Sequence, residues 1–378
     1  MNKFKYYFIL LLAGAAIISC SKKDDDDVVV EPPRDYAVQY KADNDSIEKY
    51  LKTNYITVSA DFDVVITKIP AGGTQVSIWD QKLYPLEIRP VYNRDVNYKV
   101  YYLTLRKGSG ESPCNTDRIY TSYSGNLLDG TSFDSSYGLG RSFELYGAGI
   151  IDGWGEIFPK FKTGIASAPS SNGAITYTDY GAGVMFLPSG LGYYNSVQGS
   201  IPAYSPLVFS FKLFDLQRLD HDLELVNGST AIVPDGVPDY LEDVNGDGYV
   251  YNFKDTEKYP NPPASLVDDT DGDGLADFLD FDDDGDGFKT RFEITKPTGA
   301  PNTGISLYYP WNPIGDDLNT PNINESETFG IPRRPTGELT NPALPESASN
   351  PRKFVEDDYK AAGRLRIHLD KTYPYKAN

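Results

Sequence analysis

The sequence predicts an α+β fold, in which an antiparallel sheet packs on a short helix and is followed by an irregular acidic ribbon and an extended C-terminal tail. Three observations predict it. Large apolar residues alternate along residues 207–213, which places them on one face of a strand. Asp129-Gly130 is a tight-turn pair between apolar runs. From Asp269 onward, aspartate and glycine recur at the spacing of metal-binding loops, and no flanking helices are evident.

The chain begins with the features of a secretory signal of the lipoprotein kind. Lys3 and Lys5 precede an apolar run over residues 8–18, and Cys20 follows small residues at a cleavage site. The apolar run is shorter than the ~20 residues that span a bilayer, although a transmembrane anchor is the alternative. We therefore expect Cys20 to carry lipid as the first residue of the mature chain.

The residues after Cys20 include a run of four aspartates, whose mutual repulsion keeps the segment solvated as a tether. This run resembles the acidic export signal of surface lipoproteins of the Bacteroidetes. The resemblance implies an outer-membrane lipoprotein displayed on the cell surface. An ordinary flexible linker facing the periplasm is the alternative.

Composition narrows the classes of partner. The 378 residues carry a formal charge of −19, and the length argues for two or more folding units. A negative chain lacks the basic groups that neutralise phosphate, so nucleic acid is excluded as a partner and divalent cations are the natural counter-ions. Cys114 is the only cysteine besides Cys20, and we interpret it as a buried apolar thiol.

The first elements after the tether are a short helix and several strands. The stretch Asp43-Asn44-Asp45-Ser46 offers a helix N-cap before the apolar positions of residues 47–51. Strands are expected at residues 64–66, 74–79 and 98–105, where apolar residues are dense or alternate. The last of these strands leads into a glycine-rich turn at residues 107–110.

Three motifs follow one another along the chain. They are the stretch from Tyr123 to Ser136, the run Ile150-Ile151-Asp152-Gly153-Trp154, and Ile201-Pro202 followed by the strand that begins at Leu207. Gly153 lets the backbone turn beside an indole that can form a flat apolar floor. The order and spacing of these motifs resemble an FKBP-type peptidyl-prolyl cis-trans isomerase. The resemblance covers about a third of the chain, and the positions that match the family's pocket are Tyr123, Phe133, Asp134, Ile150, Ile151, Trp154, Tyr193 and Phe209.

The resemblance also implies roles for these residues. Phe133, Trp154 and Phe209 would wall and floor a site for a proline ring. Ile151 would offer its backbone N–H, and Tyr193 its hydroxyl, to carbonyl groups of the substrate. Asp134 would lie beside the twisting amide, with turn capping as its alternative role.

Some positions depart from the family pattern and point to a remodelled rim. Arg141 stands where an aromatic wall residue is usual, and Tyr146 and Tyr194 replace glycines. Residues 165–183 read as an insertion, and the loop over residues 194–200 is short. We expect these changes to lower turnover more than binding. The remaining aromatic and aliphatic positions are interpreted as core: Phe143, Leu145, Phe211 and Leu213.

The acidic ribbon contains two consecutive twelve-residue loops and an earlier partial copy. Carboxylates at positions 1, 3, 5 and 12, with glycine at 6, converge oxygens on one calcium ion. The arrangement resembles thrombospondin type-3 repeats, which implies a structural calcium cofactor. A solvated acidic linker is the alternative. The predicted ligands are Asp235, Asp239, Glu242, Asp243, Asn245, Asp247, Asp269, Asp271, Asp273, Asp277, Asp280, Asp282, Asp284, Asp286 and Glu293.

Residues beyond Glu293 are rich in proline, asparagine and aromatic residues, with one helix expected at residues 355–366. Aromatic content favours packing over disorder, and the basic residues of this tail suit docking on the acidic ribbon or on a partner protein. The domain prediction is a signal peptide at 1–19, a tether at 20–35, an accessory N-terminal region at 36–94, an FKBP-like domain at 95–220, calcium repeats at 231–294 and a C-terminal extension at 295–378.

Together these features predict a lipid-anchored isomerase or chaperone that acts on proline-containing client proteins after their export. The alternative is a catalytically weak FKBP-like docking subunit of an outer-membrane secretion, assembly or nutrient-uptake complex. Hydrolytic chemistry is disfavoured, because His221 and His368 are the only histidines and neither lies in a recognisable nucleophile motif.

Overall fold

A computed structural model describes residues 32–136, 138–297, 304–311, 313–315 and 326–374. The signal peptide, Cys20 and most of the tether lie outside these residues. The chain divides into two compact units between residues 34 and 35, and every helix and strand described below belongs to the second unit. Within the described part, no helix has both the length and the apolar content needed to cross a bilayer.

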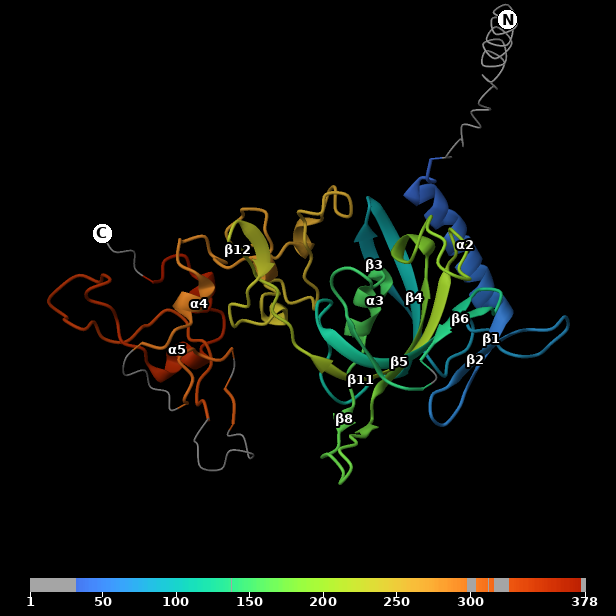
Figure 1. The fold of residues 1–378 in the computed structure, drawn as a ribbon, viewed down its shortest axis with the longest axis horizontal. Helices are drawn as coiled ribbons and strands as arrows, with labels where there is room; N and C mark the ends of the chain where they lie inside the picture. The colour runs from blue at the N-terminus through green and yellow to red at the C-terminus, as the bar shows by residue number, and fades with distance from the viewer. Residues whose placement is uncertain (1–31, 137, 298–303, 312, 316–325, 375–378) are drawn as a thin grey trace, which may run out of the picture. The chain divides into compact units, whose positions relative to one another are not determined.

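A seven-stranded antiparallel sheet forms the centre of the fold (Figure 1). The predicted alternating strand and tight turn are both present, since Gly130 adopts φ 91° and its N–H donates to the Leu127 carbonyl. The strand order is β3 (Leu86–Asn93), β4 (Val96–Arg106), β10 (Gly181–Leu187), β11 (Leu207–Gln217), β5 (Arg118–Leu127) and β6 (Ser132–Ser135), with β7 (Arg141–Glu144) also paired to β5.

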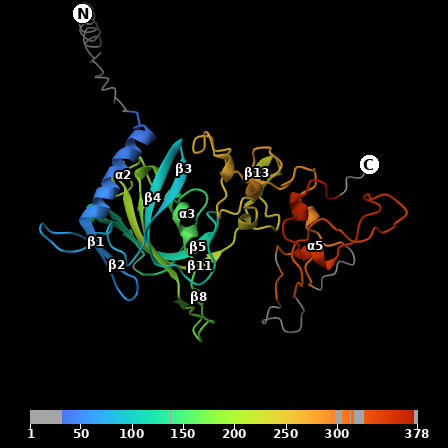
Figure 2. The ribbon, with the colours of Figure 1, turned by 180° about the vertical axis from the view of Figure 1, so that it is seen from behind.

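Helices cover both faces of this sheet. On one face α3 (Asp152–Ile157) contributes Trp154 and Ile157 to the larger core. On the other face α2 (Tyr36–Thr53), seen from behind in Figure 2, contributes Ile47 and Leu51 to a second core. Because side chains alternate along a strand, neighbouring residues of β4 and of β10 enter different cores. Every residue of β10 is buried, since both faces of this central strand are covered.

The N-terminal helix differs from the predicted one in length and cap. It begins at Tyr36, and Asp35 is its N-cap, accepting from the Val38 N–H at 3.0 Å. Asp43, which belongs to the predicted capping stretch, lies buried inside the helix. Its carboxylate accepts from Gln39 Nε2 at 2.7 Å and from the Ser189 N–H at 2.8 Å. Asp43 thus joins the helix to the sheet domain instead of starting the helix.

The segment after α2 is partly a hairpin and partly an edge of the main sheet. β1 (Asn54–Val58) pairs with β2 (Val64–Lys68), as predicted for residues 64–66. The strand predicted over residues 74–79 is wrong, because the Ile78 and Trp79 N–H groups donate to carbonyls at the end of α2. β3 pairs with β4 along its length, so the region 36–94 supplies one strand of the sheet.

The insertion at residues 165–183 contains a short hairpin of β8 (Ile165–Ala166) and β9 (Tyr177–Thr178) before the chain enters β10. A second hairpin, β12 (Leu223–Val226) with β13 (Ser229–Ile232), follows β11. The other elements are short helical segments: η1 (Phe158–Lys160), η2 (Ser189–Leu191), η3 (Asp239–Leu241), η4 (Ala264–Leu266), η5 (Asp277–Leu279), α4 (Thr290–Glu293), α5 (Glu356–Lys360) and η6 (Ile367–Leu369).

The described part of the C-terminal tail packs on the acidic segment, as the sequence suggested. Val237 and Ile294 share a small core with Tyr309, Ile331 and Tyr359 of the tail. The predicted helix over residues 355–366 is shorter than expected: α5 ends at Lys360, and the chain turns through Gly363 at φ 78°. This left-handed conformation favours glycine and does not continue an α-helix.

Candidate functional sites

Five aromatic rings converge between the sheet and α3. They come from different elements: Tyr123 from β5, Phe133 from β6, Phe143 from β7, Trp154 from α3 and Phe209 from β11. The Trp154 ring lies edge to face against three of them, with centroid distances of 5.1 Å to Tyr123, 5.1 Å to Phe143 and 5.4 Å to Phe209. Phe133 meets Phe209 at 5.4 Å.

The predicted pocket residues divide into a buried and a half-buried group within one hydrophobic cluster. Trp154 and Phe209 are each 3% exposed, and Tyr123 and Ile151 are also buried. Phe133, Ile150 and Tyr193 are only partly buried and pack against this group. The structure therefore brings the predicted apolar residues together, with a buried floor and half-exposed side chains beside it.

Gly125 on β5 makes the close approach of two rings possible. A Cβ atom at this position would lie 2.4 Å from Phe133 Cε2 and 2.9 Å from Phe209 Cε1. Real Cβ atoms do not approach other atoms so closely, so only glycine allows both rings to lie over the strand here. The aromatic cluster thus depends on a small residue in the strand beneath it.

Polar groups lie at one side of the aromatic cluster. The Tyr123 hydroxyl donates to Asp134 Oδ2. Burial, together with this carboxylate, raises the pKa of Tyr123 to about 12, while the nearby Arg141 guanidinium acts in the opposite direction. The pKa of Tyr193 is also raised, mainly by burial and partly by the Asp134 charge. Asp134 is therefore a shared neighbour of two hydroxyl groups.

Two N–H donors in this region find no acceptor among the described residues. One of them is the buried Trp154 Nε1–H. Ile151 is the N-cap of α3 and its carbonyl accepts from the Trp154 N–H, but within the described residues no group accepts from its own N–H. Position and availability are both consistent with the role that the family resemblance assigns to the Ile151 N–H.

One pocket residue was missed by the sequence reasoning. Phe143, interpreted there as core, is half-buried and lies edge to face against Trp154 and Tyr123. It supplies the aromatic ring whose absence was inferred from Arg141. Arg141 itself is exposed and interacts with the Tyr123 hydroxyl. The sequence does contain a signal for this position: Phe143 lies two residues after Arg141, and residues two apart in a strand lie on the same face.

The two tyrosines that replace glycines connect the domain to its neighbouring segments. Tyr194 adopts φ 49°, the left-handed conformation in which glycine is favoured, and its ring stacks on Tyr36 of α2 at 4.0 Å. The Tyr146 ring lies edge to face against His221 and Phe278, each at 5.3 Å. The departures from the family pattern are thus packing residues for α2 and for the acidic segment.

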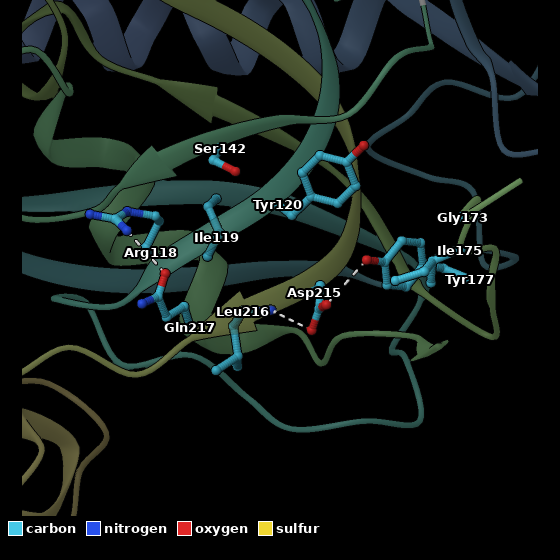
Figure 3. A pocket seen from close by; sticks show the side chains of 10 residues that line it. All are labelled: Arg118, Ile119, Tyr120, Ser142, Gly173, Ile175, Tyr177, Asp215, Leu216 and Gln217. Carbon is cyan, nitrogen blue, oxygen red and sulfur yellow. Dashed lines mark hydrogen bonds between the residues drawn. The ribbon is translucent and has the colours of Figure 1, made fainter. Parts of the chain in front are cut away.

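A separate groove of about 420 Å³ lies between the ends of β5 and β11 and the inserted hairpin (Figure 3). Tyr177 from the hairpin donates to Asp215 at 3.2 Å, and Arg118 donates to Gln217 at 3.0 Å. None of the predicted pocket residues lines this groove. It is therefore distinct from the aromatic cluster.

The acidic segment contains three loops of the same local geometry. In each loop, the glycine five residues after the first aspartate donates its N–H to that carboxylate. The distances are 2.7 Å for Gly248 to Asp243, 2.9 Å for Gly274 to Asp269 and 3.0 Å for Gly287 to Asp282. Each glycine has a positive φ, between 87° and 93°. The partial copy predicted from Asp235 therefore forms its loop at residues 243–248.

Carboxylate oxygens converge in two of these loops. Asp269, Asp271 and Asp273 form one group within 4.8 Å of one another, and the corresponding residues of the next loop form another: Asp282, Asp284 and Asp286. Glu293, the twelfth position of that loop, is 4% exposed, and both of its oxygens lack a hydrogen-bond partner. Oxygen-only donor sets with orphaned buried carboxylates fit calcium.

Several other predicted ligands accept hydrogen bonds from neighbouring protein groups. Asp239 accepts from the His221 N–H at 2.9 Å and meets His221 Nδ1 at 2.6 Å. Asp277 accepts from the Thr270 N–H and hydroxyl. Asp280 accepts from the Asp282 N–H, Asn245 donates from Nδ2 to Asp268 and accepts from the Asp247 N–H, and Asp247 accepts from the Tyr249 N–H. Asp235 and Glu242 belong to a further group of buried carboxylates with Asp222 and Asp283.

A buried polar contact joins the sheet domain to the acidic segment at Glu156 of α3. The Tyr251 hydroxyl donates to its carboxylate at 3.2 Å, and Arg89 Nη2 lies 3.3 Å from it. Tyr249 donates to the Glu156 carbonyl at 2.9 Å. Burial raises the pKa of Glu156 to about 7, because loss of water outweighs the attraction of Arg89 and the Tyr251 hydrogen bond.

Part of the chain is similar to known proteins. Residues 109–214 match the family model of FKBP-type peptidyl-prolyl cis-trans isomerases. The FKBP-type 22 kDa peptidyl-prolyl cis-trans isomerase of Escherichia coli K12 is 31% identical over 115 residues, which are 30% of this chain and 48% of that protein. FkpA of the same strain is 30% identical over 116 residues, which are 31% of this chain and 37% of that protein.

Residues 109–214 therefore form a domain of the FKBP-type peptidyl-prolyl cis-trans isomerase family, which is a class of enzymes. The chain spans less than half the length of either relative named above. The crystal structure of FkpA from Escherichia coli covers 48% of this chain and 61% of that chain, with 25% identity and a TM-score of 0.29. Residues 234–322 match a second family model, described as BamM C-terminal.

Proposed function

We propose that this chain is a peptidyl-prolyl cis-trans isomerase and chaperone for proline-containing client proteins. The observation that carries the proposal is the convergence of Phe133, Trp154 and Phe209 beside the bonded pair Tyr123 and Asp134. The barrier to rotation about an X-Pro bond is ~18–20 kcal/mol, because the amide loses its conjugation as it twists. A dry apolar surface that holds the proline ring favours the twisted amide over the planar one.

The chain's own residues have distinct roles in this proposal. The aromatic rings hold the proline side chain and exclude water. The Ile151 N–H and the Tyr193 hydroxyl donate to carbonyl oxygens of the substrate and fix its orientation. Asp134, held by Tyr123, lies beside the rotating amide. The mechanism needs no nucleophile and no general base.

The setting is proposed from the sequence. Lipid on Cys20 anchors the chain to the outer membrane, the acidic tether leads it to the cell surface, and the clients are secreted or outer-membrane proteins. Calcium in the loops at residues 243–248, 269–280 and 282–293, which resemble thrombospondin type-3 repeats, rigidifies the acidic segment. Orphaned buried oxygens such as those of Glu293 support this role for the metal.

The proposed activity is tested by measuring the cis-to-trans rate of a short Ala-Pro peptide with the purified chain in calcium. We expect a rate that rises linearly with protein concentration. A rate equal to that of buffer, in a preparation whose near-ultraviolet circular dichroism shows ordered tyrosine and tryptophan, would remove the enzyme claim.

A second candidate is a docking subunit of an outer-membrane secretion, assembly or nutrient-uptake complex. The observation that favours it is that the acidic segment and tail share a small hydrophobic core and lie outside the isomerase match. Isolation of the chain from native membranes and identification of what accompanies it tests this candidate. Recovery of the chain alone would count against it.

A further inference from the structure

Four buried carboxylates meet at a point outside the three loops of the acidic segment. Asp222 precedes β12, Asp235 follows β13, Glu242 follows η3 and Asp283 lies in the loop before α4. One carboxylate oxygen from each of the four lies within 4.8 Å of the others. Their fractional exposures are 0%, 3%, 0% and 1% in the same order.

Most oxygens of this four-carboxylate cluster have no hydrogen-bond partner in the part of the chain that the structure describes. Asp222 accepts from the Asp235 N–H through one oxygen, and Asp235 accepts from the Val237 N–H through one oxygen. These bonds fix the orientation of the two side chains and leave their second oxygens unused. The six unpartnered oxygens are Asp222 Oδ1, Asp235 Oδ2, both of Glu242 and both of Asp283.

The cluster also has no positive charge of its own. Across the described ranges, no lysine, arginine or histidine forms a salt bridge with any of the four carboxylates. Arg291 comes near but donates to the Asp235 carbonyl at 3.1 Å. Some other buried acids do have a basic partner: Asp117 with Arg218, Glu156 with Arg89, Asp239 with His221 and Asp358 with Arg364.

Burying one unpaired carboxylate costs several kcal/mol, and four close together also repel one another. We propose that the four-carboxylate cluster binds one calcium ion. Calcium takes six to eight oxygen ligands, a number that the unpartnered oxygens can supply. The absence of nitrogen and sulfur donors from the set disfavours zinc and copper. Magnesium usually keeps several waters, which suits a site with so little exposure less well.

This site is independent of the loop sites and of the isomerase activity. Asp283 is the second residue of its loop, whereas the loop ligands occupy the odd positions and position twelve. Asp222 lies outside the acidic repeats altogether. An ion here would join segments 61 residues apart, because it would tie the start of β12 and the end of η3 to the loop before α4. It would therefore fix the β12–β13 hairpin on the acidic segment.

The test counts calcium ions on the purified full chain by native mass spectrometry, with calcium chloride as the only added metal. Asp222→Asn and Glu242→Gln should each bind one ion fewer than the parent chain. Asp45→Asn, a change of the same kind at an exposed helix residue paired with Lys41, should leave the count unchanged. An unchanged count in both Asp222→Asn and Glu242→Gln would overturn the proposal and would mean that the cluster holds protons instead of metal.

A second variant distinguishes loss of the proposed calcium site from loss of folding. The triple change Asp243→Asn, Asp269→Asn and Asp282→Asn removes the first ligand of each loop and leaves the four-carboxylate cluster intact. It should retain one calcium ion, and complete loss of calcium would overturn the proposal. In chelator, Asp222→Asn should melt at a higher temperature than the parent, because it removes one of four repelling charges, and in calcium at a lower one. Equal shifts in both conditions would also contradict a metal site.

Discussion

The Tyr123 hydroxyl donates its hydrogen bond to Asp134 Oδ2 across the β5–β6 pair, and the nearby Arg141 guanidinium acts to lower the pKa of the same hydroxyl. This hydrogen bond holds the exposed Asp134 side chain of β6 beside Tyr123 of the aromatic cluster. Interactions between charged groups and a hydroxyl of this kind contribute about 1.5–3 kcal/mol each. The carboxylate near the proposed substrate amide is therefore oriented by Tyr123 through one oxygen and by the Ser135 N–H, at 2.8 Å, through the other.

Removing that hydroxyl should lower activity more than stability. Tyr123→Phe keeps the ring but releases Asp134, so we expect kcat/KM for an Ala-Pro peptide to fall about tenfold, which corresponds to about 1.4 kcal/mol. Asp134→Asn should give a loss of similar size, and the double variant should lose little more than either single one. Additive losses in the double variant would show that the two residues act separately.

Tyr194 and Tyr36 should be coupled in their effects on stability. Tyr194→Gly relieves a left-handed backbone but removes a buried ring, so we expect a net loss of about 2 kcal/mol in the free energy of unfolding. Tyr36→Ala removes the other half of the stack. A double-mutant cycle measured by urea denaturation should give a coupling energy of about 1 kcal/mol. Zero coupling would mean that the stacked rings do not join α2 to the loop.

Glu156 should make stability depend on pH between 4.5 and 7. Its pKa is raised to about 7 in the folded chain from an ordinary value of 4.5, so the folded state holds a proton that the unfolded state has lost. Stability should therefore fall as pH rises through this window, by about 3 kcal/mol, and the effect should be complete above pH 7. Glu156→Gln should remove this component.

The measurement is the free energy of unfolding of the parent and of Glu156→Gln at several pH values between 5 and 8, in saturating calcium. Because other acids titrate identically in both chains, the difference between the two curves isolates Glu156. Parallel curves would contradict the raised pKa.

Removing calcium should open the acidic segment. In chelator the carboxylates of the loops repel one another without a counter-ion, so cleavage by a protease within residues 235–293 should become at least tenfold faster. The sheet domain should remain intact in the same digest, because its cores contain none of the loop residues. Equal cleavage rates with calcium and with chelator would argue against structural metal.

The sequence was informative where local pattern and three-dimensional position coincide. Phe209 faces the core because side chains alternate along a strand, and the loops recur because Gly274 and Gly287 occupy the same turn position. The ordered motifs of the pocket also converge, since their elements belong to one sheet and the helix on its face.

Positions that are decided by residues distant in sequence could not be predicted from local sequence patterns. Phe143 reaches the pocket only because β7 pairs with β5, and Asp222 meets Asp283 only after the chain has folded. Asp43 has the local signal of a helix cap, but Ser189, which is distant in sequence, binds its carboxylate. In these cases tertiary contacts decide a position that local propensity leaves open.

The most direct test of the central claim compares two phenylalanines in the isomerase assay. Phe133 belongs to the aromatic cluster, and Phe214 on β11 packs instead on Tyr120, Tyr177 and Tyr180 beside the inserted hairpin. Both are half-buried strand residues, so replacing either one by leucine should lower the free energy of unfolding of the chain by a similar amount. We expect Phe133→Leu to lower kcat/KM about tenfold and Phe214→Leu to leave it within twofold of the parent. Equal activity of both variants and the parent would contradict a prolyl site at the aromatic cluster.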